Sequence, residues 1–106
     1  MIIDLNDENF AQTTSSGITL VDFYADWCGP CKRMLPKVES VASQLAGKVR
    51  VAKVNVDESR VTANKFAIRS IPTFAIIKDG RVITVSAGSK SEQDLLSFVE
   101  SNSGGE

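Results

Sequence analysis

Cys28 and Cys31 are the residues of this 106-residue chain whose type and spacing could carry chemistry. They lie in DWCGPCKRM (26–34), separated by Gly29 and Pro30. A C-x-x-C pair can form half of a zinc site, close a small structural disulfide, or cycle between dithiol and disulfide. The rest of the sequence has to decide among these three uses.

The zinc interpretation is short of ligands. A structural zinc site takes about four, usually cysteine and histidine, and the chain has two cysteines and no histidine. A second chain or carboxylates would have to complete the site, so we expect no metal. The lack of histidine also excludes Ser-His-Asp and Cys-His nucleophiles.

The structural interpretation offers little stabilisation. In the loop-entropy model a four-residue loop gives only about 2 kcal/mol, against about 4.7 kcal/mol for a hundred-residue loop. The pair would restrain one tight turn and nothing distant. A reducing cytoplasm would also keep such a bond open.

The redox interpretation fits the local sequence. Apolar residues recur at three- and four-residue spacing from Cys31 to Leu45, which predicts a helix with Cys28 at its start. Free N–H groups and the helix dipole at that position stabilise a thiolate. Pro30 suits the first turn of a helix, and Gly29 leaves the approach to the sulfur open. We therefore expect Cys28 to be the exposed, attacking sulfur and Cys31 the sheltered one.

Strands and helices alternate around this pair. Short apolar runs predict strands at 1–5, 18–25 and 49–57, and the dense run at 18–25 predicts a strand buried on both faces. Asp79-Gly80 predicts a hairpin at 73–86. The sequence also predicts helices at 6–14, capped by Asn6 or Asp7, at 58–66, and at 91–101, capped by Ser89 or Ser91. This order gives an α/β sandwich with parallel early strands and an antiparallel C-terminal hairpin. We expect one domain over 1–106, with a tail at 101–106 that frays.

Charge and hydropathy exclude some partners and predict a compartment. The formal net charge is −1, and nucleic acid or an anionic membrane would favour a clustered basic face. The apolar runs are too short to span a bilayer. Residues 1–10 lack the basic region and cleavage pattern of a secretory signal, so we expect a reducing cytoplasm.

Four segments together resemble the thioredoxin family: VDFYADWCGPCK (21–32), KVNVD (53–57), IRSIPTFAIIKDGR (68–81) and SAGSK (86–90). The resemblance covers essentially the whole chain and implies a three-layer sandwich. It implies a protein-disulfide reductase that donates electrons to client proteins and maintains cell redox homeostasis. The sequence gives no basis for an oligomer, so we expect a monomer. No cofactor would be bound, since a flavin-containing thioredoxin reductase would supply electrons from NADPH. The chain departs from the family pattern at Tyr24, Ser70 and Ser89-Lys90.

Asp22 and Lys53 are charged residues within strands that should be buried. A buried carboxylate is costly unless paired or protonated. Asp22 could face water at a strand end, or it could take the proton from Cys31 as a general base, and the resemblance implies the second role. Lys53 could be an ordinary solvated lysine, whereas the resemblance pairs it with Asp22 in a supporting role.

Pro72 and three further residues complete the expected site. From sequence alone an X–Pro bond is trans, but the resemblance implies a cis Ile71–Pro72 bond lying against the cysteines. It also implies that the Ile71 backbone, Trp27 and Gly88 form the docking surface for an extended client peptide. A non-catalytic interaction subunit that uses the same surface is the alternative function.

Overall fold

The computed structural model describes residues 1–103 as five strands and four helices. In chain order they are β1 (Ile3–Leu5), α1 (Phe10–Thr13), β2 (Ile18–Tyr24), α2 (Gly29–Gln44), β3 (Arg50–Asn55), α3 (Arg60–Lys65), β4 (Thr73–Lys78), β5 (Arg81–Ala87) and α4 (Glu92–Ser103). Each predicted strand and helix is present, although several are shorter than their sequence patterns suggested.

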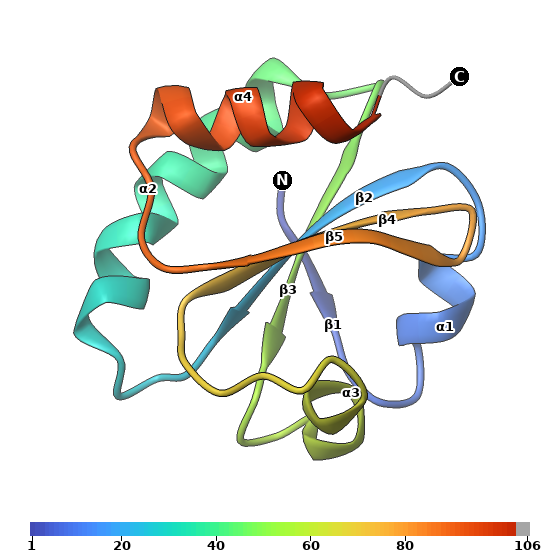
Figure 1. Cartoon of the computed structure of the whole chain (residues 1–106), viewed down its shortest axis with the longest axis vertical. Coiled ribbons are helices and arrows are strands. Elements are labelled where there is room, and N and C mark those ends of the chain that lie inside the picture. The colour runs from blue at the N-terminus through green and yellow to red at the C-terminus, as the bar shows by residue number, and fades with distance from the viewer. Residues whose placement is uncertain (104–106) are drawn as a thin grey trace.

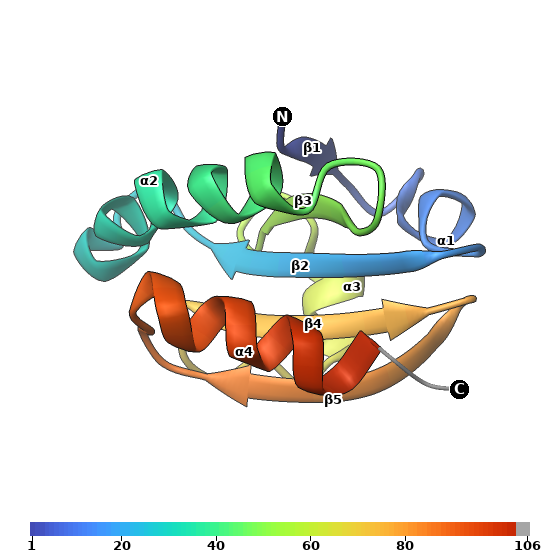
Figure 2. The same cartoon turned by 90° about the horizontal axis from the view of Figure 1, so that it is seen from above.

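The five strands form one mixed sheet in the order β1-β3-β2-β4-β5. The first three strands in this order are parallel, while β4 is antiparallel to both β2 and β5. Helices α2 and α4 cover one face, and α1 and α3 lie on the other (Figure 1). Seen from above, α2 and α4 run side by side over the sheet (Figure 2). This arrangement confirms the predicted α/β sandwich with its C-terminal hairpin.

Strand β2 lies in the middle of the sheet and is buried on both faces. Leu20 packs with Met34 and Val38 of α2 in the core under α2 and α4. Its neighbours Val21 and Phe23 point to the opposite face, in the core next to α1 and α3. Side chains alternate along a strand, so Asp22 points to the same face as Leu20 and is directed towards α2.

The β4–β5 hairpin has the turn that its sequence predicted. Asp79 and Gly80 form a two-residue loop with φ of 52° and 83°. Positive φ at both central residues is typical of a type I′ turn, which matches the twist of the flanking strands. Asp79 also accepts a hydrogen bond from the N–H of Gly17 at 2.8 Å, which ties the turn to the start of β2.

Two predictions about helix ends were wrong. The first helix begins only at Phe10, because the Asn6 side chain accepts the N–H groups of Glu8 and Asn9 and forms a turn instead. The last helix continues to Ser103, three residues into the segment expected to fray, and Asn102 donates to the Phe98 carbonyl there. Residues 104–106 lie outside the described part of the chain.

Two further helix termini are fixed by side chains. Ser91 Oγ accepts the N–H of Asp94 at 3.0 Å, so Ser91 is the one of the two predicted serines that caps α4. Asp7 accepts hydrogen bonds from the N–H groups of Val61 and Thr62 and from the Thr62 hydroxyl, which joins the N-terminal segment to α3. Across residues 1–103 no helix is long and apolar enough to cross a membrane.

Candidate active site

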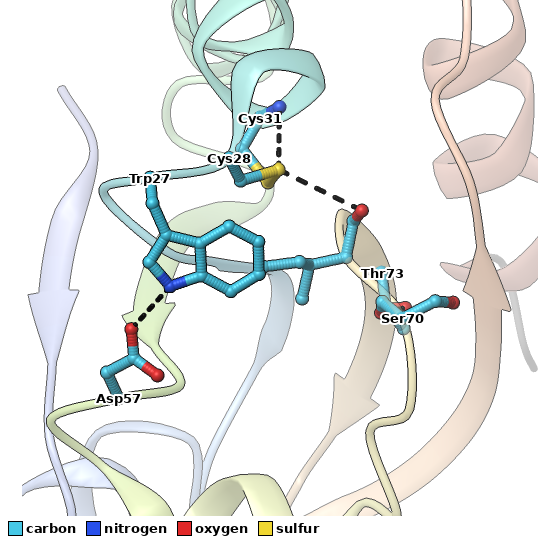
Figure 3. The surroundings of a disulfide bond; sticks show 7 residues. Trp27, Cys28, Cys31, Asp57, Ser70 and Thr73 are labelled. Atoms are coloured by element: carbon cyan, nitrogen blue, oxygen red, sulfur yellow. Dashed lines mark hydrogen bonds between the residues drawn. A yellow bond between two sulfur atoms is a disulfide. The ribbon is translucent and has the colours of Figure 1, made fainter.

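Cys28 and Cys31 form a disulfide at the N-terminal end of α2, with their Cα atoms 5.2 Å apart. Cys28 is the N-cap of this helix, and its sulfur accepts the backbone N–H of Cys31 at 3.1 Å (Figure 3). Pro30 occupies the first turn, as predicted, where its missing N–H leaves no bond unmade. The sulfur of Cys28 therefore lies where the helix dipole and the N–H of Cys31 both favour negative charge.

The expected difference in exposure between the two cysteines is absent in this disulfide form. Both residues are 4% exposed, so the prediction of an exposed Cys28 was wrong. The cause is the loop before β4: the Cys28 sulfur lies 3.9 Å from the Ile71 carbonyl oxygen and packs in a small cluster with Ala25 and Cys31, against which Ile71 lies.

The Ile71–Pro72 peptide bond is cis, as the resemblance implied. Two hydrogen bonds hold the loop that carries it. The Thr73 hydroxyl donates to the Ser70 carbonyl at 2.6 Å. The N–H of Gly88 donates to the Pro72 carbonyl at 2.8 Å, so the end of β5 is fastened to this loop.

Trp27 lies on the surface beside the disulfide. It is 70% exposed, and its Nε1 donates to Asp57 Oδ2 at 2.8 Å (Figure 3). The indole forms one wall of a shallow groove of about 130 Å³, which is also lined by Val56, Ile68, Arg69, Ser70 and Ile71. The structure thus places Trp27 and Ile71 on one groove. Gly88 does not line it and reaches the site through the Pro72 carbonyl.

Asp22 lies behind the disulfide at one side of a cleft of about 350 Å³. Cys31, Leu35 and Lys53 line the same cleft, together with Tyr24, Ala25, Asp26 and Lys32. Asp22 is 2% exposed, and its Oδ1 has no hydrogen-bond partner among residues 1–103. Burial raises the pKa of Asp22 to about 7, while the positive charge of Lys53 acts in the opposite direction.

Lys53 stands next to Asp22 in the register of the parallel strands. Its Nζ lies 3.7 Å from Asp4 Oδ1 of β1 and 5.4 Å from the centre of the Tyr24 ring. No ion pair with Asp22 is formed within the described chain. The lysine therefore influences Asp22 through space, from the outer part of the cleft.

Two residues of the site were not predicted from the sequence. Asp57 holds the Trp27 indole, and Val56 lines the groove beside it. Both follow the last residue of β3, close to the carboxyl end of β2, and the carboxyl ends of parallel strands meet at one edge of a sheet. Val56 and Asp57 both belong to the KVNVD segment (53–57). The hydrogen bond between Asp57 and Trp27, however, joins residues 30 positions apart in the sequence.

The site offers no cluster suited to a metal. Among residues 1–103, no group of three or more His, Cys, Asp or Glu side chains could hold a metal ion. The chemistry available here is that of two sulfurs at a helix N-terminus with a buried carboxyl behind them.

Comparison with known proteins agrees with this arrangement. The family model described as Thioredoxin matches residues 1–101. The thioredoxin of Bacillus subtilis is 40% identical over 98 residues, which cover 92% of this chain and 94% of that protein. The thioredoxin of Pseudomonas aeruginosa is 39% identical over 103 residues, covering 95% of each chain.

Proposed function

The chain belongs to the thioredoxin family, and from this premise we propose that it donates electrons to disulfides of client proteins, with Cys28 attacking and Cys31 resolving. The protein is a thiol–disulfide oxidoreductase that reduces protein disulfides. The observation that carries this function is the Cys28–Cys31 disulfide at the N-terminus of α2.

The reaction has two exchanges. The Cys28 thiolate attacks one sulfur of a client disulfide, an S–S bond forms between protein and client, and the other client sulfur leaves as a thiolate. The Cys31 thiolate then attacks the Cys28 sulfur, and the second client sulfur leaves. Two electrons pass to the client, and the protein is left with the Cys28–Cys31 disulfide.

The position of Cys28 supports its role as the attacking sulfur. As N-cap it has the N–H of Cys31 directed at its sulfur, and the positive end of the α2 dipole lies behind it. Both interactions stabilise a thiolate, which is the nucleophile in this exchange. The tight turn through Gly29 and Pro30 keeps Cys31 within reach for the second step.

Asp22 is suited to act as the base for Cys31. The two residues line the same cleft, and with its pKa raised by burial to about 7 the carboxyl can accept and release a proton near neutral pH. The cleft has room for water, which could carry the proton between the two groups. Lys53 supports this role by limiting how far the pKa of Asp22 rises.

Client peptides are expected to dock beside the disulfide. The Ile71 backbone offers strand-like hydrogen bonds, which give affinity with little sequence preference. The exposed Trp27 ring and the groove beside it provide an apolar contact. The Gly88–Pro72 hydrogen bond keeps the loop in place on the other flank.

Further properties of this role follow the family. Electrons would come from NADPH through a thioredoxin reductase, and the protein itself would bind no cofactor. It would act as a monomer in the cytoplasm, in electron transport that maintains cell redox homeostasis. No observation favours the alternative of a non-catalytic interaction subunit.

Reduction of insulin disulfides, coupled to a thioredoxin reductase and NADPH, tests the proposal. The wild type should be active, and Cys28→Ser and Cys31→Ser variants should both lose turnover. Only Cys31→Ser should accumulate a covalent complex with insulin. Accumulation with Cys28→Ser instead would invert the two roles, and an inactive wild type would favour the non-catalytic subunit.

A further inference from the structure

Three charged residues form one row across the parallel part of the sheet. In the register of the strands, Asp4 of β1 is opposite Lys53 of β3, and Lys53 is opposite Asp22 of β2. Residues opposite each other in a sheet point to the same face. The single lysine therefore stands between two carboxyl groups, one on each side.

The two carboxyl groups differ in their surroundings. The Asp4 side chain is 79% exposed at the edge of the sheet, whereas Asp22 is 2% exposed and has an unpartnered oxygen. The Lys53 side chain is 26% exposed, and its ammonium group is paired with Asp4 rather than with Asp22. The Tyr24 ring lies beside the ammonium and supports it in this outer position through a cation–π contact.

We propose that Asp4 is a positioning residue that holds the Lys53 ammonium at the outer side of the cleft, and so weakens the stabilisation of the Asp22 carboxylate by Lys53. An exposed ion pair contributes little to stability. Such a pair can shift the mean position of a flexible lysine without fixing it. The consequence for catalysis rests on the proposed role of Asp22 as the base for Cys31.

The other charged and titratable groups near Asp22 come from the remaining sides of the cleft. They are Asp26 after β2, Lys32 and Cys31 on α2, and Tyr24 on β2 itself. On the β4 side the residue opposite Asp22 is Phe74, which carries no charge. Lys53 is therefore the cation adjacent to Asp22 in the sheet register, and Asp4 is the carboxylate that competes for it.

Loss of the Asp4 charge should release Lys53 towards Asp22. An opposite charge within about 4–6 Å lowers a carboxyl pKa by roughly 1–3 units, and we expect a fall of up to about one unit for Asp22. At pH 7 the protonated fraction of Asp22 would then decrease from about one half to about one tenth. The pH profile of the resolving step would move to lower pH by the same amount.

Carboxyl ¹³C NMR titration of Asp22 in the oxidised protein tests this coupling. We expect Asp4→Asn to lower the Asp22 midpoint, and Asp4→Glu to restore it towards the wild-type value. In a Lys53→Met background, Asp4→Asn should leave the midpoint almost unchanged. Glu8→Gln removes another exposed carboxylate and serves as the matched control, and we expect it to leave the Asp22 midpoint nearly unchanged.

The proposal is overturned if Asp4→Asn moves the midpoint no more than Glu8→Gln does. It is also overturned if the shift is equal with and without Lys53, since Asp4 would then act on Asp22 directly. The rate at which Cys31 resolves the mixed disulfide is measured separately against pH. A midpoint that moves while the rate profile stays fixed would uphold the coupling and remove Asp22 as the base.

Discussion

Replacement of Asp22 by asparagine should remove a large pH-dependent component of stability from the oxidised protein. The folded chain keeps Asp22 protonated up to a pKa of about 7, whereas the ordinary value is 3.8. Between these values the folded state holds a proton that the unfolded chain has released. The contribution of Asp22 to the free energy of unfolding therefore falls as the pH rises through this window, and it is constant at higher pH.

The size of this component follows from the shift. A difference of about three units, at 1.36 kcal/mol per unit, corresponds to about 4 kcal/mol. The slope within the window is then about 1.4 kcal/mol per pH unit. Burial is the main cause, so the full effect requires that Asp22 stays excluded from bulk water.

Urea unfolding of the oxidised protein, from pH 4 to pH 8.5, measures this effect. The difference in unfolding free energy between Asp22→Asn and wild type should shift in favour of the variant by about 4 kcal/mol across this range. A pH-independent change in stability caused by the amide cancels when the difference is compared between pH values. Neither cysteine titrates, because both are in the disulfide. A difference that stays flat with pH would show that Asp22 ionises normally and would refute the argument.

Three further variants, one of them with a matched control, test other parts of the structure. Asp7→Ala should lower the urea midpoint at neutral pH, because the carboxylate accepts two N–H groups of α3 and the Thr62 hydroxyl. These bonds lower the pKa of Asp7 below 3.8, so the loss should disappear only under more acidic conditions. Gly88→Ala should cost about 1–2 kcal/mol in urea unfolding, since φ is +104° there, whereas Gly29→Ala, with negative φ, should cost less. Trp27→Ala should raise KM for insulin more than it lowers kcat, and an unchanged KM would remove the indole from the docking surface.

The parts of the fold that depend on local sequence were predictable. The dense apolar run at 18–25 predicted a strand buried on both faces, and Asp79-Gly80 predicted the hairpin. The first helix was misplaced because Asn6 can either cap a helix or close a turn, and its oxygen closes the turn. In a helix cap and in such a turn, the asparagine oxygen accepts nearby backbone N–H groups in the same way. The residue type alone therefore does not tell which of the two structures forms.

The parts of the site that depend on distant contacts were not predictable from residue patterns. Cys28 is covered by a loop that follows it by about forty residues in sequence. The Asp57 bond to Trp27 and the charged row through Lys53 require the order and register of the parallel strands. A one-residue shift in register would turn Lys53 to the opposite face. The resemblance to a family supplied the expected roles, while the geometry had to come from the folded chain.

The sulfur of Cys28 is both the end of a helix and the expected site of reaction. It accepts the N–H of Cys31 as the N-cap of α2, and serine is among the residues that fill this position best. A serine at residue 28 would therefore leave the helix start satisfied while ending the electron transfer. One substitution could therefore convert such a reductase into a binding protein without catalytic activity, while its fold is retained.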